Sequence, residues 1–334
     1  MSLLEINDLA TYYHTDNGDV HAVDGVDLTV EADETLGLVG ESGGGKSTLA
    51  KSINGMLPDN GEIVSGSIEY DGVDLTDIPE NQLRAYRWRN ISMIPQSSMN
   101  ALDPVYTVRE QIAEVFNHHV NITPAEIKEK ARELFDIVGI DPERLNDYPH
   151  QLSGGMKQRV MIAISLALDP DIVIADEPTT ALDVIVQKQI LDRLKAIQQQ
   201  RSMAIILITH DISVVSYLCD NIAVFYGGRV VEYGDVDSVI RNPQHPYTVG
   251  LKNAFPSILS DDQELVSIGG NPPTLVEPSP GCRFADRCPL AVEECREGQP
   301  PTVSDGTGWR AECLRTNDVT EQIYDETPIH GGDD

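Results

Sequence analysis

The chain has 334 residues, 40% of them hydrophobic, and a formal net charge of −30 at pH 7, from 54 acidic side chains against 24 Lys and Arg. Its length exceeds the roughly 100–200 residues of a typical single domain, so we expect one principal domain with an addition. Acidic residues run from Glu5 to Asp334, which excludes nucleic acid as the main partner, because binding a phosphate backbone requires clustered cations.

The first third of the chain predicts strands, a glycine-rich turn and a helix, in that order. Residues 1–35 alternate apolar and polar positions and carry a turn signal at Asn17-Gly18, which is typical of antiparallel strands. The run ETLGLVG predicts a short apolar strand that ends in glycines. Helical spacing then continues in KSTLAKSINGML.

The middle of the chain alternates between helices and strands. Residues from about 97 to 165 are mostly helical in pattern, with one helix expected between a cap at Thr123 and a stop at Gly139. Two buried strands follow, DIVIAD and AIILITH, separated by the helix VIVQKQILDRLKAIQQQ. Strands that alternate with helices imply a parallel sheet and an α/β fold.

The composition shifts to Pro, Gly and Cys after about residue 255. We therefore predict a principal domain at 1–255, with a helical subdomain at about 97–165. Residues 256–334 are predicted to form a small extension that contains four cysteines and ends in an acidic tail.

Residues 40–47, GESGGGKS, fit the phosphate-loop pattern G-x-x-x-x-G-K-[ST]. Its glycines let backbone N–H groups converge on phosphate oxygens, and a helix that begins at Lys46 directs its positive end at the anion. Lys46 is expected to contact the β- and γ-phosphates of ATP, and Ser47 to ligate Mg²⁺. The strand before the motif and the helix after it disfavour an ordinary glycine-rich turn. The predicted nucleotide-binding residues of this motif are Gly40, Ser42, Gly43, Gly45, Lys46, Ser47 and Thr48.

A second motif, DIVIADEP at 171–178, places two acids after a buried strand. Asp176 can hold Mg²⁺ through water, and Glu177 can polarise an attacking water. Adjacent acids after a strand are, taken alone, more often a solvated loop. The phosphate loop elsewhere in the chain favours an ATPase site instead.

A third motif, LSGGMKQR at 152–159, predicts another anion site. Gly154 and Gly155 expose backbone N–H groups at the start of a helix, and Ser153 adds a hydroxyl. One ATP held between two chains would explain why a single chain has two phosphate binders.

In this order the three motifs resemble the nucleotide-binding subunit of an ABC transporter, a P-loop NTPase whose signature motif is the LSGG found in this chain. The resemblance extends over essentially the whole chain. It implies a mixed sheet core, an antiparallel β subdomain and a helical subdomain, and two subunits that close head to tail over ATP. Catalysis would rest on Glu177, His210 and Lys46, and the presence of both Glu177 and His210 favours real hydrolysis over ATP sensing.

The resemblance implies further roles for four residues. Tyr13 would stack on adenine, although Tyr12 beside it leaves the choice open, and Asp183 in TALD would contact the other subunit. Gln96 in MIPQ would belong to the loop that senses Mg²⁺ and touches the membrane subunit, and His210 in ITHD would contact the γ-phosphate. Three of the four have a structural alternative: Tyr13 packs on the sheet, Gln96 is an ordinary loop amide, or His210 is a core histidine. The implied Mg²⁺ ligands are Ser47, Gln96 and Asp176.

The segment 242–257, NPQHPYTVGLKNAFPS, resembles the element that follows the nucleotide-binding domain in oligopeptide, dipeptide and nickel importers. This implies a heterodimer with a paralogous second ATPase subunit, two transmembrane permease subunits and, indirectly, an extracellular substrate-binding protein. Apolar runs stay far below the about 18 residues that span a bilayer, and we see no secretion signal. We expect the chain at the cytoplasmic face of the cell membrane, with Met99–Tyr106 near the permeases.

Four cysteines, Cys282, Cys288, Cys295 and Cys313, follow the predicted ATPase domain. A reducing cytoplasm disfavours disulfides, and no pair has the C-x₂₋₄-C spacing common in zinc sites. Their spacing suits an iron–sulfur cluster at least as well. The subfamily resemblance favours a 4Fe-4S cluster, with Zn²⁺, free thiols or disulfides as alternatives. Cys219 is expected to be a buried core thiol.

Three further questions stay open at this point. The acidic composition indicates a salt-loving source organism, because concentrated salt screens self-repulsion, with an ordinary acidic protein as the alternative. A soluble ABC ATPase of translation or repair is the rival function. Such proteins usually have two cassettes or a long coiled-coil insertion, and this sequence shows neither. Peptide is favoured over nickel or sugar as the substrate only by analogy.

Overall fold

The computed structural model describes residues 2–96, 101–180, 182–254, 268–320 and 323. These fall into two compact units. Unit one comprises Met1–Leu3, Val30–Thr35 and Asp77–Ile208. Unit two comprises Leu4–Thr29, Leu36–Thr76 and Thr209–Asp334. The predicted boundary after residue 255 falls outside the described residues, and the division at 1–255 and 256–334 stays a prediction.

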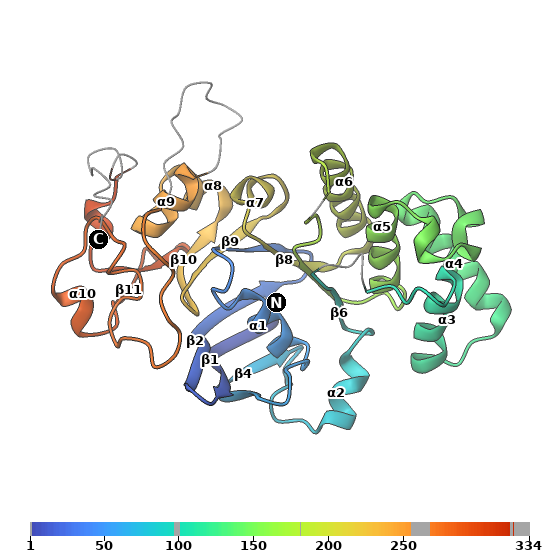
Figure 1. Cartoon of the computed structure of the whole chain (residues 1–334), viewed down its shortest axis with the longest axis horizontal. Coiled ribbons are helices and arrows are strands. Elements are labelled where there is room, and N and C mark those ends of the chain that lie inside the picture. Colours follow the sequence, from blue (N-terminus) through green and yellow to red (C-terminus); the bar gives the residue numbers. More distant parts are fainter. Residues whose placement is uncertain (1, 97–100, 181, 255–267, 321–322, 324–334) are drawn as a thin grey trace. The chain divides into compact units, whose positions relative to one another are not determined.

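Unit two contains a four-stranded sheet in the order β2-β1-β4-β5, seen in blue in Figure 1. Strands β1 and β4 pair antiparallel, with Leu4 opposite Tyr70 and Tyr13 opposite Gly61. The strands and the turn expected in the first 35 residues are confirmed. Their bounds are β1 (Ser2–Thr15), β2 (Gly18–Glu31), β4 (Gly61–Tyr70) and β5 (Val73–Asp74).

A second sheet in unit two is mixed. Strand β3 pairs parallel with β9, whereas β10 pairs antiparallel with both β9 and β12, and β12 pairs antiparallel with β11. The bounds are β3 (Thr35–Val39), β9 (Asn221–Tyr226), β10 (Arg229–Asp235), β11 (Thr302–Ser304) and β12 (Arg310–Glu312). The sequence did not predict the last two strands, which belong to the extension.

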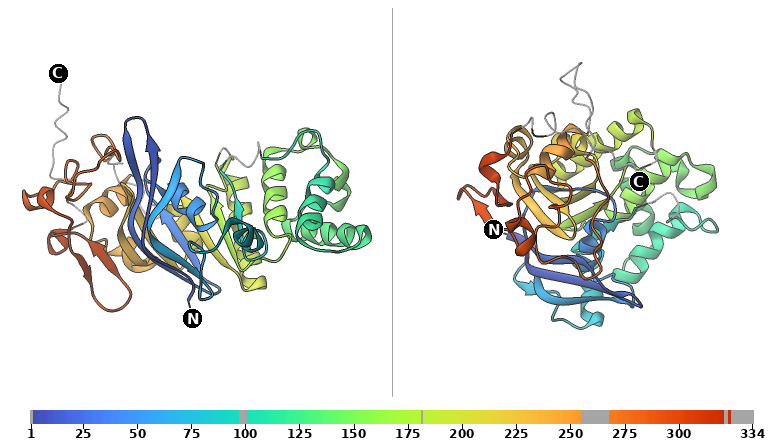
Figure 2. Two further views of the ribbon diagram at one scale, coloured as in Figure 1. Left: turned by 90° about the horizontal axis from the view of Figure 1, so that it is seen from below. Right: turned by 60° about the vertical axis from the view of Figure 1, so that its left-hand side comes forward.

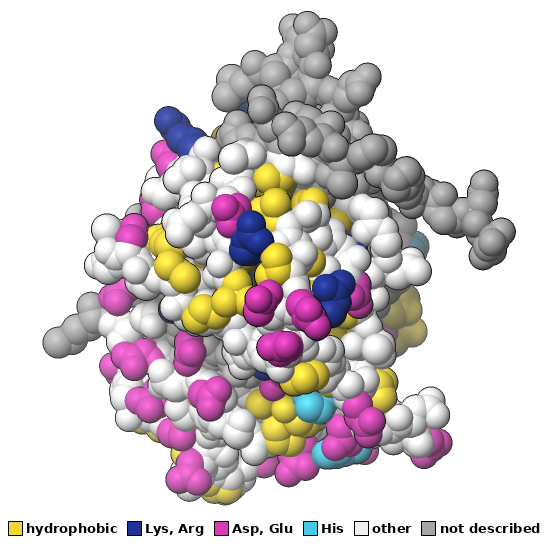
Figure 3. Space-filling view, turned by 90° about the vertical axis from the view of Figure 1, so that its left-hand side faces the viewer, with side chains coloured by type: hydrophobic (Ala, Val, Ile, Leu, Met, Phe, Trp, Pro, Cys, Tyr) yellow, Lys and Arg dark blue, Asp and Glu magenta, His cyan; other side chains and the backbone are white. Residues whose placement is uncertain are grey.

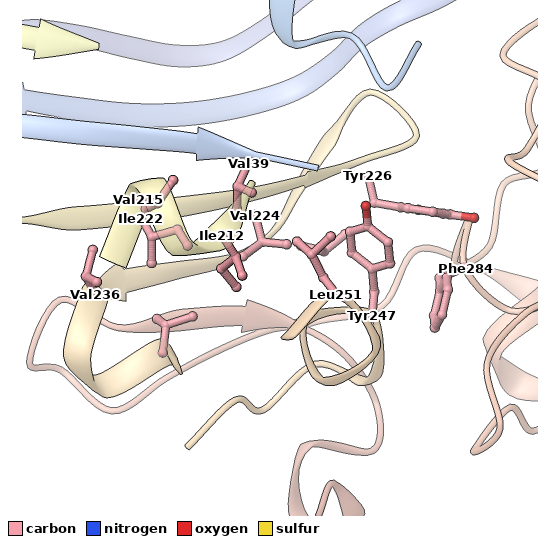
Figure 4. Packing of buried hydrophobic residues seen from close by; sticks show 12 residues of the cluster. Val39, Ile212, Val215, Ile222, Val224, Tyr226, Val236, Tyr247, Leu251 and Phe284 are labelled. Carbon is pink, nitrogen blue, oxygen red and sulfur yellow. The ribbon is translucent and has the colours of Figure 1, made fainter. Parts of the chain in front are cut away.

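Unit two also contains several helices. They are α1 (Lys46–Ile53), α7 (Ile212–Leu218), α8 (Val236–Arg241), α9 (Pro246–Asn253) and α10 (Glu294–Glu297), with a short 3-10 turn, η4 (Thr316–Asp318). Valines of β3 and β9 pack with side chains of α7 and α9 in the core (Figure 4). Phe284 of the extension, 1% exposed, is part of the same core. The extension therefore folds onto the sheet.

Unit one contains three parallel strands, β6 (Ile91–Ile94), β7 (Ile172–Asp176) and β8 (Ala204–Thr209), in that order. Every residue of β7 and β8 is buried, as their continuous apolar sequences predict. The parallel pairing expected for DIVIAD and AIILITH is confirmed.

The helices of unit one confirm most of the helical pattern. Helix α4 begins at the capping box of Thr123 and Glu126 and ends at Gly139, whose φ is 70°, as predicted. Helices α3, α4 and α5 pack together (Figures 1 and 2). The bounds are α2 (Glu80–Tyr86), α3 (Val108–His119), α4 (Pro124–Val138), α5 (Gly154–Ser165) and α6 (Val184–Arg201), with 3-10 turns η2 (Pro142–Asn146) and η3 (Pro149–Gln151). The sequence did not predict helix α2.

Within the described residues, none of the helices is both long and apolar enough to cross a lipid bilayer. Cys219 is half-buried rather than fully buried, and it packs against the edge of the unit-two core. The expectation of a buried Cys219 is therefore only partly met. Met99, one end of the segment expected near the permeases, lies outside the described residues.

Candidate functional site

The phosphate loop joins β3 to α1 in unit two, and its backbone requires glycine. Gly45 has a φ of 107°, and a Cβ atom there would lie 1.9 Å from the carbonyl oxygen of Ala22. A larger residue would push the loop away from β2. Lys46 is 5% exposed, and its Nζ donates to the carbonyl oxygens of Gly40 at 2.7 Å and Glu41 at 2.8 Å. The lysine thus lies along the inside of the loop.

The start of α1 is suited to an anion. Gly45 caps the helix without any side-chain hydrogen bond, so the first helical N–H groups are not occupied by a capping side chain. Ser42 and Gly43 are exposed, and Ser47 is partly exposed. These residues can meet a phosphate group from solvent.

The two neighbouring tyrosines of β1 have different surroundings. Tyr12 stacks on His21, with ring centroids 3.8 Å apart, and donates a 3.1 Å hydrogen bond to Asp24. Tyr13 instead shares a 3.1 Å hydrogen bond with the hydroxyl of Thr48 in α1. Of the two tyrosines, Tyr13 is therefore the one whose side chain contacts the phosphate-loop helix.

The acidic pair lies at the end of β7 in unit one. Asp176 is the last strand residue and is 3% exposed. Glu177 has a φ of 46°, unusual for a residue with a side chain. Its carboxylate accepts hydrogen bonds from Gln96 at 3.0 Å and Thr180 at 2.9 Å. The structure therefore brings the predicted loop glutamine onto the predicted catalytic carboxylate.

His210 follows β8 and is exposed. This excludes the alternative that His210 is a satisfied core histidine. The next residue, Asp211, caps α7 by accepting from the N–H of Ser213 at 2.8 Å, which fixes the backbone where the histidine projects.

Ser153, Gly154 and Gly155 of the LSGG motif line one groove of about 480 Å³ in unit one, together with Asp183. Ser153 caps α5 by accepting from the N–H of Met156 at 3.3 Å, and Asp183 caps α6 by accepting from the N–H of Val186 at 3.0 Å. A Cβ atom on Gly155 would lie 2.7 Å from Cγ1 of Val186. The second glycine of the motif is thus required by close packing of α5 against α6.

The predicted site residues divide between the two units. Gln96, Asp176, Glu177, Asp183 and the LSGG motif belong to unit one, and Tyr13, the phosphate loop and His210 belong to unit two. Within unit one the structure joins Gln96 to Glu177 and the LSGG motif to Asp183. Within unit two it joins Tyr13 to the phosphate loop.

Sequence reasoning missed two residues that contact the phosphate loop. The hydroxyl of Tyr247 accepts from the N–H of Glu41, and Arg287 pairs with the Glu41 carboxylate. Both lie in stretches that the sequence singled out for other reasons, Tyr247 in NPQHPYTVG and Arg287 between two of the cysteines. Their separation of more than 200 positions from Glu41 leaves no local signal.

The four cysteines of the extension line one small cavity of about 10 Å³, together with His245. All five cysteines of the chain are free thiols. Burial raises the pKa of Cys282 to about 11 and that of Cys288 to about 12. Within the described residues, no three His, Cys, Asp or Glu side chains are arranged to hold a metal ion. The four thiols line the same cavity, but they are not placed to coordinate one metal ion together.

Comparison with known proteins agrees with these motifs. Residues 23–180 match the family described as ABC transporter, and residues 231–295 match the oligopeptide/dipeptide transporter, C-terminal region. An oligopeptide transport ATP-binding protein of Bacillus subtilis, AppD, is 44% identical over 316 residues, covering 94% of this chain and 96% of the relative. OppD of Salmonella typhimurium, of the same description, is 46% identical over 301 residues, covering 89% of each chain.

Solved structures agree as well. An ATP-binding cassette determined as a dimer in a post-hydrolysis state, bound to ADP and Pi, superimposes with a TM-score of 0.62 at 26% identity. The match covers 70% of this chain and 98% of that cassette. The chain belongs to the ABC transporter family and is one of its ATP-binding ATPase subunits.

Proposed function

We propose that this chain hydrolyses ATP to drive the import of peptides through an ABC transporter. The observation that carries the peptide assignment is similarity along nearly the whole chain to proteins named for oligopeptide transport. Within the importer class, nickel or sugar is the alternative substrate. The catalytic part of the proposal is supported by the hydrogen-bonded carboxylate of Glu177 at the end of a buried strand.

The phosphate loop binds the triphosphate in this proposal. Lys46 turns from the loop carbonyls to the β- and γ-phosphates, and the loop N–H groups surround the phosphate oxygens. Tyr13 stacks on the adenine. The hydroxyl, carboxylate and amide oxygens of Ser47, Asp176 and Gln96 are ligands of the kind that Mg²⁺ prefers. When bound, Mg²⁺ supplies charge neutralisation of the phosphates.

Glu177 is the proposed general base. Its carboxylate polarises the attacking water and accepts its proton, and the amide of Gln96 and the hydroxyl of Thr180 orient it. His210 contacts the γ-phosphate. The positive φ of Glu177 is a strained backbone conformation of the kind found at active sites.

A second subunit completes the ATP site. Ser153, Gly154 and Gly155 of one chain face the phosphate loop of the other, and Asp183 lies at the contact. Val184 and Ile185, beside Asp183, are 80% and 72% exposed, which is consistent with a face that a partner covers. ATP closes the pair because it binds the closed state better than the open one. The proposed partner is a paralogous ATPase subunit.

Two permease subunits and, indirectly, an extracellular substrate-binding protein are the other proposed partners, with the chain on the cytoplasmic face of the membrane. Val105 and Tyr106, which are 70% and 51% exposed, are proposed to contact a permease. Replacement of both by Ser should weaken binding to the permeases while leaving ATP binding unchanged.

For the four cysteines we propose a 4Fe-4S cluster, with Zn²⁺ as the alternative. Support comes from four thiols around one cavity. One observation opposes the cluster: among the described residues, no three His, Cys, Asp or Glu side chains are arranged to hold a metal ion. A broad absorption at roughly 400 nm in anaerobically purified protein would support the cluster. Stoichiometric zinc without that absorption would reject it.

Reconstitution tests the function directly. The chain is co-expressed with the permeases and the second ATPase subunit, placed in vesicles and supplied with ATP, and peptide, nickel and sugar uptake are measured in parallel. ATP-dependent peptide uptake supports the proposal. Uptake of nickel or sugar without peptide uptake would show that the substrate is nickel or sugar instead of peptide. Co-purification with ribosomes instead of permeases would favour the rival role in translation.

A further inference from the structure

Glu41, the second residue of the phosphate loop, is held at three points. Its N–H donates to the hydroxyl of Tyr247 at 2.9 Å, and its carbonyl oxygen accepts from Lys46 at 2.8 Å. Its carboxylate accepts two hydrogen bonds from the guanidinium of Arg287, at 2.7 and 2.8 Å. Tyr247 and Arg287 come from segments that follow the loop by 206 and 246 positions.

Arg287 is itself fixed by its surroundings. Its side chain is 6% exposed. Beyond Glu41, it donates to the Tyr226 hydroxyl at 3.1 Å and to the carbonyl oxygens of Gly269 at 2.8 Å and Ile268 at 3.2 Å. A two-bond guanidinium–carboxylate pair in which further N–H groups are satisfied has a defined geometry.

Three aromatic side chains from different elements support this pair (Figure 4). The ring of Tyr226 lies 4.5 Å from that of Tyr247 and 5.1 Å from that of Phe284, measured between centroids. The guanidinium carbon of Arg287 lies 5.7 Å from the centre of the Tyr226 ring. The extension therefore reaches the phosphate loop through a packed aromatic group.

The segment that carries Arg287 is a compact turn between two cysteines. The N–H of Ala285 donates to the carbonyl oxygen of Cys282 at 3.0 Å, and the N–H of Arg287 donates to that of Phe284 at 3.0 Å. The position of Arg287 is thus set by the fold of the extension.

The negative charge of Glu41 explains how the Arg287–Glu41 ion pair can affect nucleotide binding. A carboxylate next to a loop that binds a triphosphate repels the ligand, and the repulsion is strong where water is partly excluded. The Glu41 side chain is 27% exposed, so solvent screens it only in part. The positive charge of Arg287 cancels that repulsion at the carboxylate itself.

We infer that Arg287 is a positioning residue of the ATP site: by neutralising and fixing Glu41, it sets the affinity of the phosphate loop for nucleotide. The C-terminal extension thereby takes part in ATP binding. This inference rests on the ATP site proposed above, and it adds a contribution from outside the nucleotide-binding motifs.

The test uses the full chain with a fluorescent ATP analogue. Arg287→Met should raise its dissociation constant about tenfold, because the Glu41 charge is then uncompensated. The double variant Glu41→Gln/Arg287→Met should recover most of the lost affinity. The matched control is Arg296→Gln, also in the extension, which removes an exposed pair with Asp286 and should bind as the wild type does.

Kinetics give a second measurement. In Arg287→Met the KM for ATP should rise, while kcat at saturating ATP should change by less than about twofold, since the residue acts on binding rather than on the reacting phosphate. A variant that is merely unstable would lose kcat in proportion to the unfolded fraction.

Each outcome decides the inference. Wild-type affinity in Arg287→Met, or a double variant that binds no better than Arg287→Met, overturns it. Failure of the wild type to bind the analogue counts against the ATP site instead. If Arg287→Met does not fold, Glu41→Gln decides, since it should bind at least as tightly as the wild type, and weaker binding overturns the inference.

Discussion

The amide of Gln96 donates a 3.0 Å hydrogen bond to the carboxylate of Glu177. Gln96 follows β6 and Glu177 follows β7, and these strands are parallel neighbours, so the ends of two adjacent strands meet at the same edge of the sheet. In the proposed transporter, this bond connects the residue that activates water to a loop expected to touch the membrane subunit. Movement of that loop would shift the proposed base.

Glu177→Gln should lower ATP turnover about 100-fold or more, because the amide keeps the shape of the side chain but cannot accept a proton. Nucleotide binding should persist, and the variant should trap a nucleotide-bound dimer, as judged by size-exclusion chromatography with Mg-ATP. Glu133→Gln, on the exposed face of α4, is the control for loss of one carboxylate. Undiminished turnover in Glu177→Gln would remove the residue from its proposed role.

Gly155→Ala should destabilise unit one by about 1–3 kcal/mol, since the added methyl group overlaps Val186 and forces α5 from α6. The ATPase rate should fall with it, because the groove of the LSGG motif is displaced. Adding Val186→Ala should restore part of both losses. Thermal unfolding and steady-state hydrolysis measure the two effects.

Gly298→Ala is the control for that series, because none of the described residues lies within 4 Å of the added Cβ atom and the φ of Gly298, −163°, is accessible to alanine. If Gly155→Ala is as stable and as active as this control, the close packing of α5 against α6 is not needed for stability or for ATP hydrolysis.

Asp24→Asn should lower the free energy of unfolding by about 1–3 kcal/mol at neutral pH, because it removes the charged partner of two partly buried arginines. Asp24 pairs with Arg229 at 3.1 Å and with Arg283 of the extension. Burial alone would raise the pKa of Asp24, but the two arginines and the Tyr12 hydroxyl outweigh it and hold the pKa below its ordinary value of 3.8.

The pH dependence of this variant follows from that lowered pKa. The stabilisation by Asp24 is present above pH 3.8 and is lost as the pH falls through the lower pKa of the folded state. The difference in unfolding temperature between wild type and Asp24→Asn should therefore shrink in acid. A difference that is constant from about pH 7 down through the acid range would contradict the assignment. Asp286→Asn, at a 91% exposed carboxylate, should show almost no effect.

Salt should stabilise the whole protein. The formal net charge is −30, and acidic side chains outnumber cations on the face of unit two that carries the extension (Figure 3). Screening by salt reduces repulsion among them. The unfolding temperature is expected to be higher in about 2 M than in about 0.1 M KCl. Equal or better stability at the lower concentration would argue for an ordinary acidic protein.

Features set by neighbouring residues could be predicted from the sequence. The phosphate loop needs glycines at fixed spacing before a helix, and α4 is bounded by a capping box at one end and a left-handed glycine at the other. Each of these depends on interactions within a few positions of the chain.

Features set by distant partners could not be predicted. Arg287 and Glu41 are 246 positions apart, and the sequence offers each of them many partners of opposite charge. The pairing of β12 with β10 was likewise missed, because β12 is a strand of three residues, too short to give a periodic pattern. The sequence predicted that Glu177 follows a buried strand. Its hydrogen bond to Gln96 could not be predicted, because it depends on the register in which β6 pairs with β7.

The pairing of β12 with β10 also determines how the protein can be dissected. Ala311 lies opposite Glu232 and Arg310 opposite Tyr233, while the indole of Trp309 donates to the buried Glu232 carboxylate at 3.2 Å. A truncated protein that stops near residue 255 would expose the unpaired backbone groups of β10 at the edge of the sheet, and exposed edges promote aggregation. It would also remove the hydrogen bond that Trp309 donates to the buried Glu232 carboxylate. The ATPase domain is therefore expected to be insoluble without its C-terminal segment.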